Sequence, residues 1–196
     1  MKKKVISALI ILALLVVPAF TAGCDTVTSF FKKNQTQNTQ AAKRANFLKA
    51  YDAMKKEVAQ KADDALLVGV LLLKKPEEPW DGSSSTWRAA FYSQKNQKVY
   101  TVMWENGSAR IDKEDKPEKG IENKVIAGPV SVDSVDALEI AKATMLTQID
   151  PNAQTNFTEL ILAYSNSKKK HVWKISFANN HYVYVDAVSG EVLEAK

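Results

Sequence analysis

The chain of 196 residues is poor in the residue types from which most metal and redox sites are built. It has one cysteine and two histidines, which excludes an internal disulfide and any zinc or iron–sulfur site made of cysteines. It contains no Gly-x-Ser-x-Gly or His-Glu-x-x-His motif, and its seven glycines form no phosphate-binding loop. These absences argue against the common hydrolase and nucleotide-binding classes. We therefore expect a protein that is not an enzyme and that needs no cofactor.

An excess of charge of one sign is also missing. The formal net charge is +5, but without Lys2, Lys3 and Lys4 of the leader, 24 basic side chains stand against 22 acidic ones, which leaves +2. Recognition of phosphates depends on clustered positive charge, so we expect no nucleic acid partner. The hydrophobic fraction of 45% and the charged fraction of 25% are typical of globular proteins and exclude a disordered or collagen-like chain.

The first 24 residues have the three parts of a secretory signal. Three lysines are followed by an apolar run from Val5 to Phe20, and small residues precede Cys24. The apolar run is short for a membrane-spanning helix, and Pro18 interrupts it. The ending Thr-Ala-Gly-Cys resembles a bacterial lipobox, with Thr21 where leucine is commonest.

The lipobox resemblance implies cleavage before Cys24 and a covalent lipid on its sulfur. We then expect residues 1–23 to be the signal peptide and the mature protein to be anchored in the bacterial cell membrane, facing the extracytoplasmic side. An attached lipid also explains an unpaired cysteine in an exported chain, where a free thiol would be reactive. A simple secretory signal and an uncleaved anchor are the alternatives.

Residues 24–40 are the lipidated cysteine and a polar tether, and a first module is expected over 41–112. The spacing of apolar residues predicts a helix from Ala41 to about Lys61. The apolar run from Ala65 to Leu73 predicts a buried strand, with continuation of the helix as the alternative. Three strands follow after a loop rich in proline and serine, at 86–92, 98–104 and 108–112.

The second half repeats this order after a charged linker at 113–124, where we place the domain boundary. In residues 125–196, Asp133 is a suitable N-cap for a helix that ends before Pro151. Strands are predicted at 159–165, 171–177, 182–186 and 191–195. The expected fold class is α+β, with two small modules that each pack one helix on an antiparallel sheet of three or four strands. Residues 125–196 should then fold alone.

The C-terminal third resembles a PepSY domain. The resemblance rests on the helix VDSVDALEIAKATML, on the strand from Val172 to Phe177, and on the ending YVYVDAVSGEVL from Tyr182. Residues 41–112 are at best a degenerate relative, and a membrane-attached leader before two such modules is similar to the layout of YpmB-type envelope proteins. The resemblance implies a helix on an antiparallel sheet, no catalysis, and a role in binding and restraining peptidases or other envelope enzymes.

The ending of the chain also has a structural explanation. A tight turn at Asn179 and Asn180 would pair the strands on either side and place Trp173, Tyr182 and Tyr184 on one face, under the helix. Asp186 can accept backbone N–H bonds in the last turn, and Gly190 can supply a positive φ there. In this register His171 and His181 lie on opposite faces, which argues against a shared metal ion.

Two tryptophans are candidates for contact with a partner. Trp80 lies in a loop flanked by prolines, and Trp104 ends a strand beside a turn. Tryptophan is enriched at interface hot spots, although local packing is the alternative for both residues. We expect a protein-binding lipoprotein that inhibits or regulates a peptidase or cell-wall enzyme. The alternatives are a structural or assembly lipoprotein without inhibitory effect, and a hydrolase with an unrecognised site.

Overall fold

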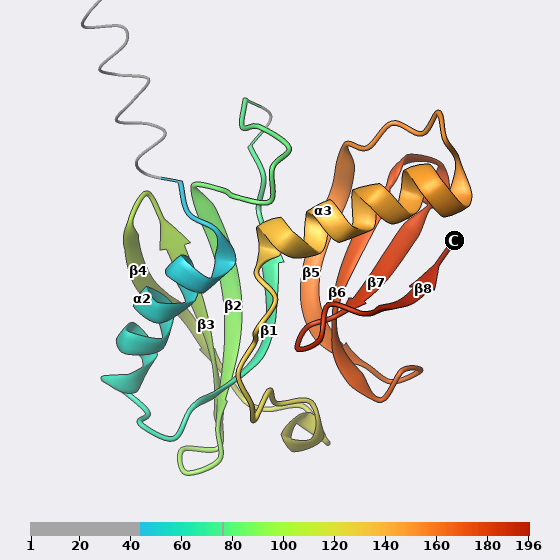
Figure 1. Cartoon of the computed structure of the whole chain (residues 1–196). Helices are drawn as coiled ribbons and strands as arrows, with labels where there is room; N and C mark the ends of the chain where they lie inside the picture. The colour runs from blue at the N-terminus through green and yellow to red at the C-terminus, as the bar shows by residue number, and fades with distance from the viewer. Residues whose placement is uncertain (1–43, 76) are drawn as a thin grey trace, which may run out of the picture. The chain divides into compact units, whose positions relative to one another are not determined.

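One antiparallel sheet with two helices on one face makes up the described part of the chain (Figure 1). The computed structural model describes residues 44–75 and 77–196, so the leader, Cys24 and the tether lie outside it. The first half contains α2 (Phe47–Ala59), β1 (Leu66–Leu72), β2 (Thr86–Ser93), β3 (Lys98–Glu105) and β4 (Ser108–Asp115). The second half contains α3 (Ser134–Thr144), a π-helical turn (Met145–Ile149), β5 (Phe157–Ser165), β6 (Lys170–Phe177), β7 (Tyr182–Asp186) and β8 (Val192–Ala195).

The eight strands form a single sheet rather than two. Their order is β4-β3-β2-β1-β5-β6-β7-β8, and the halves join where β1 pairs with β5, with Val70 opposite Leu162. The α+β class is confirmed. The division into separate modules at 113–124 stays a prediction, and residues 113–115 belong to β4. No helix within 44–75 or 77–196 is long and apolar enough to span a membrane.

The order of elements in the first half recurs in the second, and one buried contact recurs with it. The indole Nε1 of Trp87 donates to the carbonyl of Ala45 at 3.0 Å, two residues before α2 begins. The indole Nε1 of Trp173 donates to the carbonyl of Val132 at 2.9 Å, two residues before α3 begins. Each tryptophan thus fixes the chain that enters the helix above its own strand.

The N-termini of the two helices meet and share their caps. Asp133 is the N-cap of α3, as expected, and its Oδ1 accepts from the backbone N–H of Ser134 at 2.6 Å. The same oxygen accepts from the N–H of Leu48 in α2 at 3.2 Å, and Ser134 Oγ accepts from the N–H of Phe47 at 2.9 Å. The first N–H groups of a helix have no partner inside it and carry partial positive charge. One carboxylate therefore stabilises both helix ends.

Aromatic packing continues this connection into the core. The ring of Phe47 lies 5.8 Å from that of Trp87 and 5.4 Å from that of Trp173, measured between centroids. All three side chains are fully buried. The hydrophobic core therefore runs without interruption under both helices.

The predicted register of the hairpin between β6 and β7 is wrong by one residue. The turn is longer than expected, because residues 178–180 form a 3-10 turn and the N–H of Phe177 donates to the carbonyl of His181. Trp173 therefore lies opposite Val185, and Ile175 lies opposite Val183. A shift of one residue moves every side chain of a strand to the other face. Val183 and Val185 consequently fill the core, whereas Tyr182 and Tyr184 lie on the face without helices.

Candidate binding groove beside Trp80

A groove of about 750 Å³ lies between the end of β1 and the start of β5. Its walls come from residues 71–75, from Trp80, Thr86 and Glu105, and from residues 157–159. Apolar side chains from two strands of different halves thus meet charged side chains at the rim. Trp80 is the one residue of the groove that the sequence singled out.

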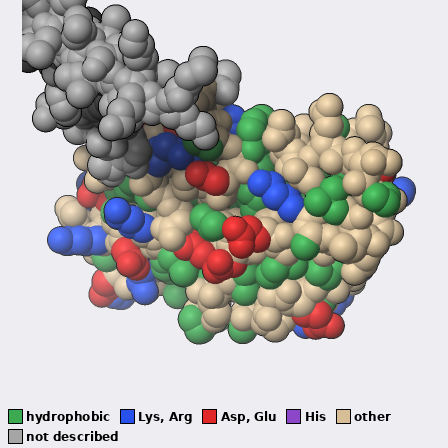
Figure 2. Space-filling model, turned by 45° about the horizontal axis from the view of Figure 1, so that its top comes forward, with side chains coloured by type: hydrophobic (Ala, Val, Ile, Leu, Met, Phe, Trp, Pro, Cys, Tyr) green, Lys and Arg blue, Asp and Glu red, His purple; other side chains and the backbone are tan. Residues whose placement is uncertain are grey.

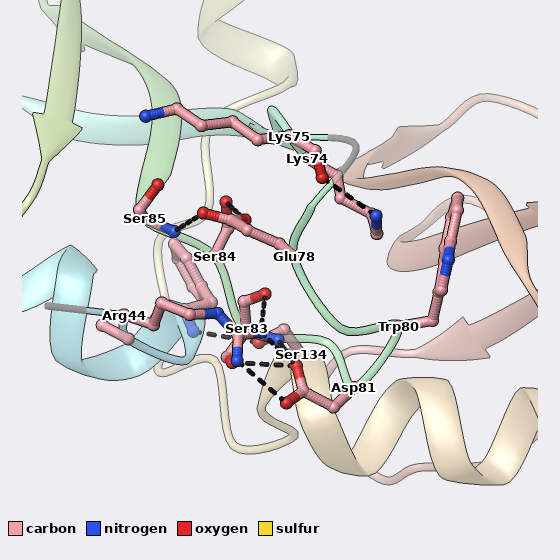
Figure 3. A network of polar contacts seen from close by, with 12 residues as sticks. Arg44, Lys74, Lys75, Glu78, Trp80, Asp81, Ser83, Ser84, Ser85 and Ser134 are labelled. Atoms are coloured by element: carbon pink, nitrogen blue, oxygen red, sulfur yellow. Dashed lines mark hydrogen bonds and ion pairs between the residues drawn. The ribbon is translucent and has the colours of Figure 1, made fainter. Parts of the chain in front are cut away.

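Trp80 is held in place on three sides, although 37% of its surface is exposed. Lys74 Nζ lies 3.8 Å from the centroid of its ring, and the ring of Phe157 packs edge-on at 4.9 Å. The carbonyl of Trp80 accepts from Lys142 Nζ of α3 at 2.7 Å. Figure 3 shows Lys74 reaching toward the ring. The result is an aromatic surface that is exposed and yet fixed.

A buried carboxylate organises the loop that carries Trp80. Glu78 is only 8% exposed, and its carboxylate accepts from Ser84 Oγ at 2.8 Å and from the backbone N–H of Ser85 at 2.9 Å (Figure 3). Burial acts to raise the pKa of Glu78, but the hydrogen bonds from Ser85 and Ser84 outweigh it and hold the pKa below its ordinary value. Glu78 therefore stays charged and keeps the loop closed near neutral pH.

An ion pair ties the same loop to the segment that enters α2. Arg44 Nη2 lies 2.6 Å from Asp81 Oδ1 and donates to the carbonyl of Ser83 at 2.9 Å. Gly82, with φ of +80°, packs against α3 so closely that a Cβ would lie 2.8 Å from the carbonyl oxygen of Ser134. Only glycine fits this position without strain. The loop is thus clamped to both helices, which explains how Trp80 keeps its place.

Acid should weaken this clamp, because the pKa of Glu78 is lower in the folded protein. Such a group contributes stability above its unfolded pKa of about 4, and loses that contribution as the pH falls through the folded value. We expect the free energy of unfolding to fall as the pH drops below about 4. Glu78→Gln should cost about 1–3 kcal/mol at neutral pH and should flatten this acid dependence, measured by urea unfolding at several pH values. The exposed neighbour provides the control, Glu77→Gln, and an equally flattened curve for that variant would contradict the assignment.

Trp104 does not join Trp80 at the groove, and contact with a partner is wrong for it, whereas the alternative of local packing is confirmed. It is only 3% exposed and lies opposite Trp87 across β2 and β3, on the face that α2 covers. Tyr100 and Val102 alternate with it along β3 and are buried on the same face. Packing under the helix, rather than contact with a partner, accounts for Trp104.

The residues of the C-terminal motif lie away from the groove. Asp186 Oδ1 accepts from the N–H groups of Val188 and Ser189, and Oδ2 lies 2.8 Å from Lys170 Nζ. Burial opposes these contacts, but they lower the pKa of Asp186 below its ordinary value. Gly190 has φ of +75° in the same turn. These contacts give Asp186 and Gly190 a structural part in the turn between β7 and β8.

The two histidines contact separate backbone carbonyls. His171 Nε2 lies 3.3 Å from the carbonyl of Lys124, and His181 Nδ1 lies 3.1 Å from that of Lys196. Among residues 44–75 and 77–196, no three His, Cys, Asp or Glu side chains gather as a metal site would require.

The outer edges of the sheet are poorly suited to pairing with another strand. Strand β4 carries the ion pairs Arg110–Asp112 and Lys113–Asp115, and charge on an edge strand discourages pairing. Strand β8 has only four residues. On the face seen in Figure 2, acidic and basic side chains are interspersed among apolar ones. The groove is therefore a better candidate for recognition than either edge.

Several residues of the groove were missed by sequence reasoning. Phe157 begins β5 two residues before the predicted strand start, and Lys74 lies two residues after the end of β1. Their contacts with Trp80 join positions far apart in the chain, and no local pattern indicates them. The only available signal was an aromatic residue in a loop, directly after Pro79.

Comparison with known proteins supports the fold and leaves the family open. No family model matches this chain, and no curated protein matches it. A solved structure described as a "putative lipoprotein" of Clostridium difficile 630 is similar, with a TM-score of 0.51 and 16% sequence identity over 74% of this chain and 91% of that chain. The PepSY resemblance thus stays a prediction, and the chain shares its α+β fold with a solved bacterial protein.

Proposed function

We propose that this chain is a lipid-anchored protein of the bacterial cell envelope that binds another envelope protein at the groove beside Trp80. One observation carries the binding role: an aromatic side chain with 37% of its surface exposed is fixed by Lys74, Phe157 and Lys142. A side chain that is already ordered loses little conformational entropy when a partner covers it. Tryptophan in such a setting is a typical hot spot of a protein interface.

The anchor and the class of partner rest on the sequence. The ending Thr-Ala-Gly-Cys supports a lipid on Cys24, and the similar solved structure is itself described as a lipoprotein candidate. The PepSY-like ending supports a peptidase or cell-wall enzyme as the partner, which this chain would inhibit or regulate. In this proposal the chain itself performs no catalysis.

Replacing Trp80 should weaken the complex without unfolding the protein. We expect Trp80→Ala to lower the affinity for the partner at least about tenfold, since truncation of an aromatic hot spot costs about 2 kcal/mol or more. Capture from detergent-solubilised membranes identifies the partner, and titration with the purified partner measures the affinity. The matched control is Leu146→Ala, because Leu146 is exposed to a similar extent, 39%, in the π-helical turn.

The activity of the partner, measured in the same complex, distinguishes the regulatory role from its alternatives. Loss of the partner's activity on binding supports inhibition, whereas unchanged activity supports an assembly role. Equal affinity for wild type and Trp80→Ala would contradict a role for the groove. Turnover of peptides or glycans by purified residues 25–196, abolished by a point substitution in this chain, would contradict the non-enzymatic function.

A further inference from the structure

The sheet opens at its centre, where the two halves meet. Strand β1 pairs with β5 through Gly69–Ala163, Val70–Leu162 and Leu71–Ile161. The next pairs in this register would be Leu72–Leu160 and Leu73–Glu159, and the structure does not form them. Strand β5 nevertheless continues back to Phe157, and its start still pairs with β6 on the other side. Residues 157–160 therefore form a strand edge inside the sheet, and the groove lies along it.

The internal repeat shows that this opening departs from the symmetry of the sheet. Leu72 lies opposite Trp87, and Leu162 lies opposite Trp173, so Leu72 and Leu162 are equivalent positions. One residue earlier in each strand, Leu71 corresponds to Ile161. These two residues are paired with each other, so the pairing of β1 with β5 is centred on equivalent positions. Pairing continues on one side of this centre, through Val70 and Gly69, and stops on the other. Pairing therefore extends two residues beyond Leu71–Ile161 on one side, where it ends at Gly69–Ala163, and does not extend at all on the other.

The loop before β2 explains why β1 leaves its partner. The N–H of Leu73 donates to the carbonyl of Thr86, and the carbonyl of Leu73 accepts from Ser84 Oγ at 3.2 Å. Both contacts draw the end of β1 toward β2. Trp80 then stands over Phe157 at the start of β5, at the mouth of the opening.

A buried polar group points to an absent ligand at the same place. Thr86 lines the groove, is only 7% exposed, and its Oγ1 has no hydrogen-bond partner among the described residues. An unsatisfied buried hydroxyl costs free energy, so such groups normally have a partner. The backbone of a bound chain would supply both this partner and the missing ladder of β5.

We propose that an extended peptide segment of the partner protein adds to β5 as a strand along residues 157–160, inside the groove. This inference rests on the proposed function and names the partner's chemistry and its binding mode. Strand addition satisfies unpaired N–H and C=O groups of an edge with those of the incoming chain. The peptide occupies the course that β1 would have followed had it continued beside β5.

The walls of the groove define the side chains of this segment. Successive side chains of a strand point to opposite faces, so one side would meet Trp80 and Phe157, and an apolar or aromatic residue fits there. The other side would meet Thr86, Glu105 and Glu159. Two lysines and two glutamates line the groove, and Glu159 already contacts Lys174 Nζ at 3.0 Å. A nearly neutral segment therefore fits, and moderate salt should change its affinity little.

The first experiment locates the contact on the membrane-anchored full chain. A photo-reactive amino acid replaces Thr158 beside the groove, Lys113 on the β4 edge, or Ala195 on the β8 edge, one at a time, in the native cell. We expect a cross-link to the partner from position 158 and none from 113 or 195. A cross-link from an outer edge alone would overturn this inference and leave the proposed function intact, whereas no cross-link or co-purified partner at all would contradict the proposed function.

The second experiment tests the hydrogen-bond ladder with a defined probe. A short capped peptide of alternating valine and threonine is compared with a twin that is N-methylated at alternate residues, which removes the donors facing β5. We expect the plain peptide to bind at least about tenfold tighter, to compete with the partner, and to slow amide exchange in residues 157–160. Trp80→Ala should weaken its binding and Leu146→Ala should not.

The peptide experiment can also contradict the proposed binding mode. Equal binding of the N-methylated twin, protection of β4 or β8 amides instead of residues 157–160, or no binding of the plain peptide would each overturn strand addition at β5.

Discussion

Replacing Trp173 with alanine is expected to lower the free energy of unfolding by about 3–5 kcal/mol, as for other large aromatic residues truncated in a core. Trp173 is fully buried, and its indole packs at 5.4 Å against Phe47 of the other half. The substitution also leaves the carbonyl of Val132 without its donor, at the entry to α3. Urea unfolding followed by far-ultraviolet circular dichroism measures the loss.

The control for Trp173→Ala is the same substitution at Trp80, which is partly exposed. Trp80→Ala should cost about 1 kcal/mol, less than Trp173→Ala, because 37% of the Trp80 surface is already exposed. Loss of Trp173 should also destabilise the first half, since Phe47 belongs to α2. A small effect of Trp173→Ala, or separate unfolding of the two halves, would show that the cores are not joined as described.

Replacing Cys24 with alanine is expected to prevent both lipidation and cleavage of the leader. The thiol is the attachment point that a lipobox requires, so Cys24→Ala should leave an uncleaved, longer precursor without lipid. Intact-mass measurement of the purified protein reports both effects, and partition between detergent and aqueous phases tests the anchoring of the wild type. Two or three acyl chains give stable anchoring, whereas one chain is marginal, so the wild type should partition into detergent. The uncleaved variant keeps the apolar run from Val5 to Phe20 and is distinguished by its mass.

A neighbouring substitution controls for effects on the leader in general. Thr26→Ala keeps the cysteine and should be cleaved, lipidated and partitioned as wild type. A wild-type protein that is unlipidated and begins at a residue other than Cys24 would contradict the lipobox assignment.

The fold class was predictable because its signals are local. The strands on either side of residues 94–97 are rich in aromatic and β-branched residues, and both formed within one residue of their expected bounds. Asp133 caps α3 because a short acidic side chain before an apolar stripe can bond the first free N–H groups. The alignment of Trp87 with Trp173 was likewise visible from the order of elements.

The register of the last hairpin was not predictable, because one residue in a turn decides it. Asn179 and Asn180 both adopt positive φ, at 58° and 61°, as a two-residue turn would also require. The structure nevertheless includes Ala178 in the turn, so that Phe177 lies opposite His181. Tyr182 and Tyr184 therefore exchange faces with Val183 and Val185, although all four residues suit a buried strand equally well.

The groove depends on contacts that no sequence pattern expresses. Its position follows from where the pairing of β1 with β5 stops, and that pairing joins residues about ninety positions apart. Trp80 was singled out for its loop, but its neighbours Phe157 and Lys142 come from the other half. Trp104 is a candidate for partner contact from its place at a strand end, and only the position of α2 shows that this end is covered.

The pairing of β1 with β5 is also the geometry of a symmetric homodimer. Two equivalent strands that run antiparallel about one point, between Leu71 and Ile161, are related by an approximate two-fold axis, as in an isologous interface. Here residues 116–133 join the two similar halves in one chain. The association of the halves is therefore intramolecular and does not depend on protein concentration. Identical subunits would have to open on both sides of the axis or on neither, whereas two fused copies can differ. Fusion thus permits strand pairing that extends further on one side of the axis than on the other.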